Sequence, residues 1–197
     1  MSESLITKKA LGEALKELMT KQPFEKIGIK DICDACGLNR NSFYYHFRDK
    51  QDLVIWIFDF EFIQKIKSDE YNDALDFFEA TCTYFYEHKD FYVRVFDLTG
   101  QNCFSDYFSE VFHQFSLEYM ERYFGEVENR EDFARFVTDA LRMALIRWLK
   151  DPTDIPPSEI KERAKKALFA IAERCLTLYP EEMDAYKKEN SNDLSGN

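Results

Sequence analysis

Apolar residues recur every three or four positions along most of this chain, the spacing that lines one face of an α-helix. The first such stretch holds six apolar positions: Ile6, Ala10, Leu11, Ala14, Leu15 and Leu18. Thr7 is a candidate N-cap, and the helix should end near Lys21 because Pro23 disfavours helical backbone at the residue before it. Phe24 and Ile27 then predict a connecting loop that is anchored in the core.

Two short helical segments follow, separated by a glycine. The first should begin near Ile29 and bury Ile32. Gly37 favours the left-handed conformation that ends a helix, and Asn39 is a good N-cap for the next segment, residues 40–47. Two helices joined by a tight glycine turn, after one supporting helix, make a helix-turn-helix.

The pattern then predicts longer helices. Asp49 caps a fourth helix that runs through the strongly apolar segment 53–66. Helices of about 72–88 and 105–124 follow. The region from Tyr71 to Phe124 holds 17 of the 30 Phe and Tyr residues, and we call its part from Phe77 to Phe124 the aromatic belt.

Two amphipathic helices are predicted next, one on either side of a proline-containing linker at 151–157. The first has a stripe made of Phe133, Phe136, Val137, Ala140, Leu141, Ala144, Leu145 and Trp148. The second opens at Ser158, and its stripe is made of Ile160, Ala164, Ala167, Leu168, Ile171, Ala172, Cys175 and Leu176. The polar segment 181–197 predicts a disordered tail.

Composition agrees with an all-α protein. The 197 residues are 45% hydrophobic and include only six Gly and five Pro, which suits one or two helical domains with a buried core. We expect a helix-turn-helix domain at 1–48, a helical domain for effector binding and dimerisation at 49–180, and the tail at 181–197.

The net charge of −11 looks unsuitable for a nucleic-acid binder, but its distribution changes that view. Residues 1–50 carry nine Lys/Arg against seven Asp/Glu, whereas residues 51–197 carry 17 against 30. A mildly basic head on an acidic body is compatible with DNA binding by the head alone.

The five cysteines are scattered and odd in number, which argues against a disulfide framework and for a reducing compartment. Cys33 and Cys36 form a CxxC, half of a zinc site at best, and we interpret both as core residues. The longest apolar run, residues 53–58, is too short to span a bilayer, and no signal-peptide pattern is present. We therefore expect a cytoplasmic protein without a membrane partner.

Candidate DNA-contacting residues crowd the second helix of the helix-turn-helix. Arg40, Asn41 and Ser42 lie at its start, where such helices meet base edges, and Arg suits guanine as Asn suits adenine. Phosphate or sugar contacts are expected from Tyr44, Tyr45, His46 and Lys50, and either a phosphate or a base contact from Lys30. In the alternative interpretation, the two tyrosines and the histidine only cover the core.

The segments PFEKIGIKDIC and CGLNRNSFYYHFRDKQDL make the run from about Ile6 to Phe58 resemble the DNA-binding head of TetR/AcrR-type transcriptional regulators. The resemblance implies an all-helical homodimer of about nine helices per subunit, a palindromic double-stranded DNA operator and a small effector in the body. The family's DNA contacts fall on the eight candidate residues above. Gly28 departs from the hydroxyl residue often found there, so that contact is missing or passes to a backbone N–H. The segment ALIRWLKDP and the linker after it resemble a branch that contains regulators of dihydroxyacetone kinase genes.

Two further sites are expected in the body. The last two helices should pair with their symmetry mates through Phe136, Ala140, Ala144, Trp148, Ala164, Leu168, Ile171 and Cys175. Alternatively, these helices pack only within the subunit. An apolar or aromatic effector would be lined by Phe78, Phe85, Phe96, Phe108, Phe112 and Tyr119. The alternative is that these rings are plain core.

No catalytic constellation, metal site or cofactor motif is evident. Glu110 and His113 form a lone ExxH, whereas a di-iron bundle needs two such motifs and two further Glu residues. We expect a transcriptional regulator, a repressor rather than an activator, and not an enzyme. The alternatives are a regulator controlled by a protein partner without a small effector, and a helical enzyme.

Overall fold

The computed structural model describes residues 3–68, 71, 73–99, 103–124, 129–182 and 184, and all regular structure in these ranges is helical. This confirms the predicted all-α fold. The helices are α1 (Glu3–Lys21), α2 (Ile29–Ala35), α3 (Arg40–His46), α4 (Lys50–Phe58), α5 (Gln64–Ser68), α6 (Ala74–Glu87), α7 (Lys89–Val95), α8 (Phe104–Phe124), α9 (Arg130–Leu149) and α10 (Pro157–Leu178). A 3₁₀ turn spans Phe24–Lys26 and a π turn spans Asp59–Ile63.

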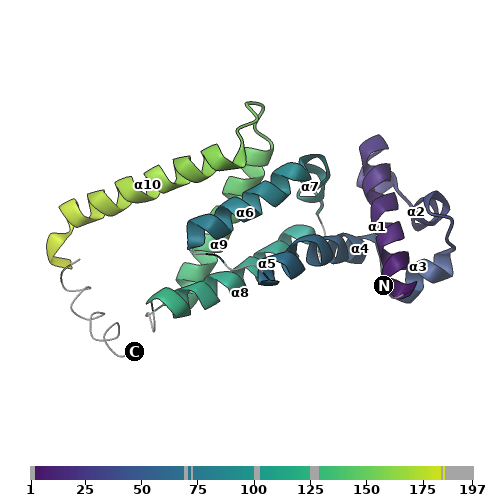
Figure 1. The fold of residues 1–197 in the computed structure, drawn as a ribbon, viewed down its shortest axis with the longest axis horizontal. Helices are drawn as coiled ribbons and strands as arrows, with labels where there is room; N and C mark the ends of the chain where they lie inside the picture. The colour runs from purple at the N-terminus through teal and green to yellow at the C-terminus, as the bar shows by residue number, and fades with distance from the viewer. Residues whose placement is uncertain are drawn as a thin grey trace.

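The molecule is elongated, with different elements at its two ends (Figure 1). Helices α1 to α3 form the head at one end, and α4 leads from the head into the body, which contains α5 to α10. Helix α1 approaches α4 closely at Gly12, where an added Cβ would lie 3.2 Å from a side-chain atom of Ile57. The head is therefore held against the last turn of α4.

The predicted caps of the head hold with one exception. Gly37 has a φ of 69°, and the Asn39 side chain accepts a hydrogen bond from the Ser42 N–H at 2.9 Å. The expectation for Thr7 is wrong, because α1 begins at Glu3 and the Thr7 hydroxyl donates to the Glu3 carbonyl within the helix. Serine and threonine inside a helix commonly bond back to a carbonyl one turn earlier.

The fourth predicted helix is present as a rod that changes its winding. Helix α4 continues through the π turn into α5 and ends at Ser68. A π turn adds a residue to one turn of the helix and is often found at functional sites. Here it carries two carboxylates, Asp59 and Glu61, into the otherwise apolar stretch 53–63.

The body is built around aromatic side chains. Phe58, Phe85, Tyr92, Phe104 and Phe108 are all buried and come from α4, α6, α7 and α8. Rings of this size bury a large apolar area and prefer tilted or edge-on contacts, and most of the contacts here have such geometry, as in Phe58–Phe104 at 87°. Helix α7, at a place where the sequence analysis predicted no helix, follows α6 after a single residue.

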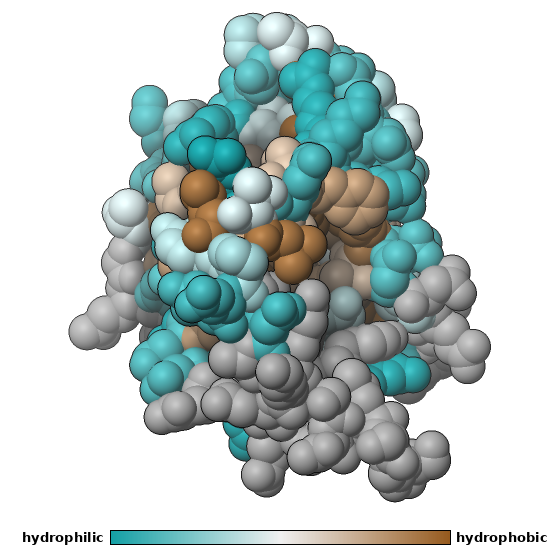
Figure 2. All heavy atoms as spheres, turned by 90° about the vertical axis from the view of Figure 1, so that its left-hand side faces the viewer, coloured by the Kyte–Doolittle hydropathy of each residue, from teal (hydrophilic) through white to brown (hydrophobic). Residues whose placement is uncertain are grey.

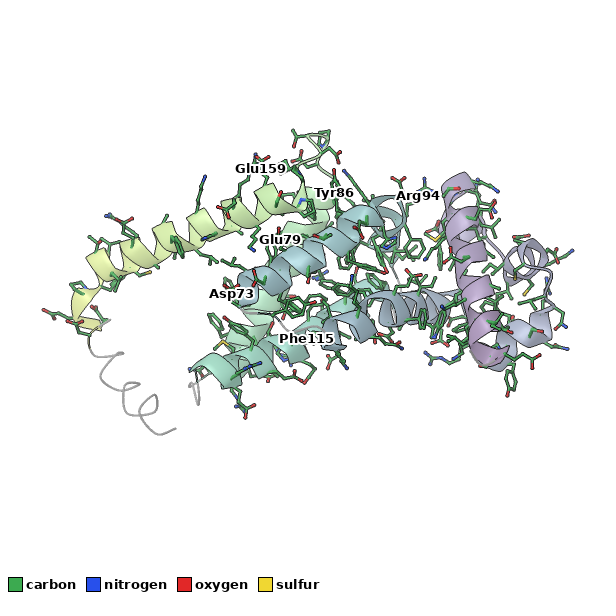
Figure 3. The ribbon with its side chains drawn as sticks, in the orientation of Figure 1. Asp73, Glu79, Tyr86, Arg94, Phe115 and Glu159 are labelled. Atoms are coloured by element: carbon green, nitrogen blue, oxygen red, sulfur yellow. The ribbon has the colours of Figure 1, made fainter. Side chains whose placement is uncertain are left out.

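The two last helices take different positions. Helix α9 packs on α8, whereas α10 packs on α6. Lys161 of α10 donates to Asp76 at 2.9 Å and to Glu79 at 2.8 Å, and Glu79 lies on the face of α6 turned to α10 (Figure 3). Beyond this anchor, α10 projects away from the body (Figure 1), and from residue 166 to 178 every residue except the half-buried Cys175 is exposed.

The predicted tail lies outside the described residues, apart from Glu181, Glu182 and Asp184. Within the described ranges, no helix is long and apolar enough to cross a membrane. In the same ranges, no three His, Cys, Asp or Glu side chains converge as a metal site would require. All five cysteines are free thiols, with Cys33 buried and Cys36 half-buried.

Candidate nucleic-acid interface

Helix α3 presents its polar face to solvent because its apolar face is held in the head. Phe43 is completely buried and anchors the helix, and the Asn39 cap fixes where the helix begins. Arg40 and Asn41 follow the cap and are both exposed. These two side chains therefore stand at the position from which a recognition helix contacts base edges.

The aromatic residues of α3 do not share one role. Tyr45 is 82% exposed and Tyr44 is 57% exposed, so neither mainly covers the core. His46 is half-buried beside Tyr45, with ring centroids 4.8 Å apart. Burial, and secondarily the charge of Lys8, lower the pKa of His46. The alternative interpretation as core cover fits His46 better than either tyrosine.

Lys30 and Ser42 lie beside this surface and differ in exposure. Lys30 is exposed on α2. Ser42 is half-buried, and its hydroxyl and its N–H both approach the Asn39 side-chain oxygen, at 3.3 and 2.9 Å. Ser42 thus supports the start of α3, whereas Lys30 is free to reach outward.

Lys50 lies in a place that the sequence did not indicate. Its ammonium donates to the carbonyls of Phe24 at 2.5 Å and Ile27 at 2.9 Å, and it sits 4.3 Å from the centroid of the Phe24 ring. Burial lowers the pKa of Lys50. In this structure the side chain ties the start of α4 to the 3₁₀ turn instead of standing free for a phosphate.

Gly28 also differs from what the resemblance implied. Its N–H, which was the expected substitute for a missing hydroxyl, donates to the Asp31 carboxylate at 2.8 Å. Asp31 in this way covers the start of α2 from within the helix, as the second partner of a capping box does.

The residues expected to line an effector pocket fill the interior of the body. The rings of Phe85, Phe96 and Phe108 lie 5.4–5.7 Å apart, and Phe108 stacks on Phe112 at 4.1 Å. All four are buried, whereas Phe78 and Tyr119 are half-buried. These four rings come from α6, the C-cap of α7 and α8, and they pack against one another, as the alternative of a plain core expects.

A pocket lies elsewhere, between the head and the body. It has a volume of about 470 Å³ and is lined on one side by α1 and on the other by the corner between α6 and α7. Its lining residues are Glu13, Lys16, Glu17, Met19, Thr20, Tyr86, Glu87, His88, Lys89, Asp90 and Phe91. No local sequence signal marks such a pocket, because its two walls are some 70 positions apart in the chain.

The end of the molecule opposite the head carries a second unusual surface. Figure 2 looks at this end and shows apolar side chains gathered in its middle. The exposed apolar residues of α9 and α10 form what we call the far-end surface. They include Phe133, Phe136, Met143, Leu168 and Ile171.

Seven of the eight residues expected at a dimer interface are at least partly accessible here, and one is not. Ala140 and Ala144 are exposed and lie beside Phe136 on α9, and Ala164 and Cys175 are half-buried on α10. Trp148 faces the other way: it is 7% exposed, donates its indole N–H to the Ile155 carbonyl at 2.8 Å and stacks on Tyr86. The expectation for Trp148 is therefore wrong.

The arrangement of the head defines a helix-turn-helix DNA-binding unit. Residues 12–56 match the model of bacterial regulatory proteins of the tetR family. Residues 72–170, just over half of the chain, match a transcriptional regulator C-terminal region of the TetR type. The chain belongs to the tetR family of bacterial regulatory proteins and is a DNA-binding transcriptional regulator.

A curated relative is the HTH-type dhaKLM operon transcriptional activator DhaS of Lactococcus lactis subsp. lactis (strain IL1403). It is 29% identical over 102 residues, which are 49% of this chain and 52% of the relative. The matched part thus spans about half the length of that relative.

Solved structures are similar over most of the chain. The dihydroxyacetone kinase operon activator DhaS has a TM-score of 0.64 at 20% identity, covering 84% of this chain and 96% of that one. NalD of Pseudomonas aeruginosa, the secondary repressor of the MexAB-OprM multidrug efflux pump, has a TM-score of 0.65 at 19% identity, covering 85% and 97%. At these identities the likeness shows the shared fold.

Proposed function

We propose that this protein acts as a homodimer that binds a palindromic DNA operator, with α3 of each subunit in the major groove. The observation that carries this proposal is the pair Arg40 and Asn41, exposed at the start of a helix that Phe43 and the Asn39 cap hold in place. Arg40 would pair with a guanine and Asn41 with an adenine. Tyr44, Tyr45 and Lys30 would contact the sugar-phosphate backbone around them.

A dimer is proposed because one head is weakly basic and the far-end surface is apolar. A net charge of +2 over residues 1–50 gives little electrostatic attraction to a duplex. Two linked heads gain affinity because binding of the second becomes intramolecular. The exposed apolar residues of α9 and the projecting part of α10 have the chemistry of an interface between copies, and α10 is long enough to reach a second copy.

Either a small effector or a protein partner would control operator binding. The filled aromatic belt supports the alternative in which a protein partner, instead of an enclosed small molecule, controls DNA binding. An apolar or aromatic effector would have to separate rings that now touch, such as Phe108 and Phe112. The two are distinguished by NMR of protein with labelled phenylalanine rings, into which small aromatic compounds are titrated. Shifted resonances of the belt rings support the effector. Unshifted resonances support the protein partner.

Repression remains our expectation for the sign of regulation, although the similar proteins include an activator and a repressor. The position of the operator relative to the promoter decides the sign. Mapping the palindrome upstream of the regulated gene, followed by transcription with and without the protein, tests it directly.

The contact assignment is tested by Arg40→Ala. Loss of a bidentate contact to guanine should weaken operator binding by roughly 1–3 kcal/mol and relax the preference at one base pair. Arg94→Ala, at another exposed arginine, on α7, is the matched control and should leave affinity unchanged. Equal affinities of all three proteins for the operator, measured by gel shift or anisotropy, would contradict the assignment.

A further inference from the structure

The π turn places two carboxylates at the junction between head and body. Asp59 accepts a hydrogen bond from the Tyr107 hydroxyl at 2.5 Å, which ties the turn to α8. Glu61 instead contacts α1 and α6. A single widened turn thus connects the rod to the head and to the core of the body.

Glu61 binds both sides with different oxygens. Its Oε1 accepts from the ammonium of Lys16 on α1, and its Oε2 accepts from the Tyr84 hydroxyl on α6 at 3.5 Å. The side chains of Lys16 and Glu61 are only 20% and 24% exposed. Partial burial makes such a charged contact stronger than one on the open surface.

The contacts continue inward from Tyr84. Its hydroxyl lies 2.6 Å from the hydroxyl of Tyr92, which is completely buried. A carboxylate only accepts hydrogen bonds. If Tyr84 donates to Glu61, its oxygen must therefore accept the proton of Tyr92, and the bonds form a chain with one direction. Bonds in such a chain strengthen one another.

The inner end of this chain lies in the aromatic core. The ring of Tyr92 contacts those of Phe85 at 4.7 Å, Phe104 at 5.5 Å and Phe58 at 6.2 Å. The position of the Tyr92 hydroxyl therefore depends on how these rings pack. That hydroxyl contacts the hydroxyl of Tyr84, which in turn contacts Glu61.

The outer end lies where the head and body are incompletely packed. The pocket of about 470 Å³ separates part of α1 from the corner between α6 and α7, and Lys16 lies on its wall. Where the pocket lies, α1 and that corner are not packed together. Beside the pocket, the Lys16–Glu61 pair links α1 to the π turn.

We propose that Glu61 is the positioning residue of the head: it holds α1 at a set orientation to the body, and it passes changes in the aromatic core to the head through Tyr92, Tyr84 and Lys16. This inference rests on the proposed operator binding and names the side chains through which control of that binding passes. It applies whether an effector or a protein partner disturbs the core.

A thermodynamic cycle tests the chain. Lys16→Met and Tyr84→Phe each remove one partner of Glu61, and each should weaken operator binding about 3-fold or more by loosening the head. The double variant should bind no more weakly than the weaker single variant. In a Glu61→Gln background the two substitutions should no longer be coupled. If, with Glu61 present, the loss of operator affinity in the double variant equals the product of the losses in the two single variants, the proposal is overturned.

Hydrogen exchange tests the same chain without DNA. Tyr84→Phe should speed exchange of the α1 amides around Lys16, although Tyr84 is on α6. Tyr86→Phe is the matched control on the same helix, because its hydroxyl bonds to Asp154 in the linker at 3.1 Å. Unchanged exchange in α1 for Tyr84→Phe would overturn the role of Glu61. If the wild-type protein binds no operator while Tyr84→Phe still speeds exchange in α1, only the proposed function is contradicted.

Discussion

The two ends of the molecule both expose large side chains, but of different chemistry. In the head, the exposed rings are Tyr44 and Tyr45, and Arg40 and Asn41 lie on the same short helix. At the far end, the exposed side chains include Phe136 at 71% and Ile171 at 60%, which have no polar group to offer.

This difference shows that exposure alone does not identify a partner. A tyrosine keeps its hydroxyl hydrated in the free protein and donates it to a phosphate in the complex, so it suits a wet, polar interface. Phenylalanine and isoleucine gain only when water is removed, at roughly 25 cal/mol for each Å² buried. The head therefore suits a nucleic acid, and the far-end surface suits a second copy of the chain.

The largest effect is expected from charging the far-end surface. Phe136→Glu would place a carboxylate from each subunit in an apolar interface, where an unpaired charge is strongly disfavoured. We expect monomers at micromolar concentration in sedimentation, and operator affinity reduced about 100-fold or more because the heads are no longer linked. Gln114→Glu on α8, also exposed, is the control and should remain dimeric. A dimeric Phe136→Glu variant would contradict the assigned interface.

A smaller effect separates two lysines of the head. Lys30→Met should lower the slope of log affinity against log salt by about one, because a phosphate contact is lost. Lys50→Met should instead lower the free energy of unfolding by roughly 1–3 kcal/mol, since carbonyls of the 3₁₀ turn lose a charged donor. If Lys50→Met changes the salt slope as Lys30→Met does, the lysine leaves those carbonyls when DNA is bound.

The smallest effect concerns two asparagines two positions apart. Asn39→Ala should lower the free energy of unfolding by about 1 kcal/mol, because the N–H of Ser42 loses its cap. Asn41→Ala should leave thermal stability unchanged and weaken binding at an adenine of the operator. Thermal unfolding and operator titration of both variants measure this. The reverse pattern would mean that the polar face of α3 has been assigned incorrectly.

The head was largely predictable, and so were most helices of the body, but the packing of the body helices was not. Gly37, Asn39 and Asp49 mark the ends of helices through interactions that reach no further than one turn, so the residues themselves report the structure. The stripe on α9 failed at Trp148 because periodicity finds apolar positions without saying which neighbour covers each one. In the structure this stripe is divided, with Trp148 turned inward and Phe136 turned to solvent.

The sequence by itself determined the helix-turn-helix, the basic head and the family resemblance, since capping, glycine conformation and spacing act locally. The tertiary structure decided which aromatic rings touch, which carbonyls accept hydrogen bonds from Lys50, and that Glu61 contacts Lys16 and Tyr84. These contacts join positions more than 20 residues apart. Their geometry depends on how whole helices pack, which no short stretch of the chain encodes.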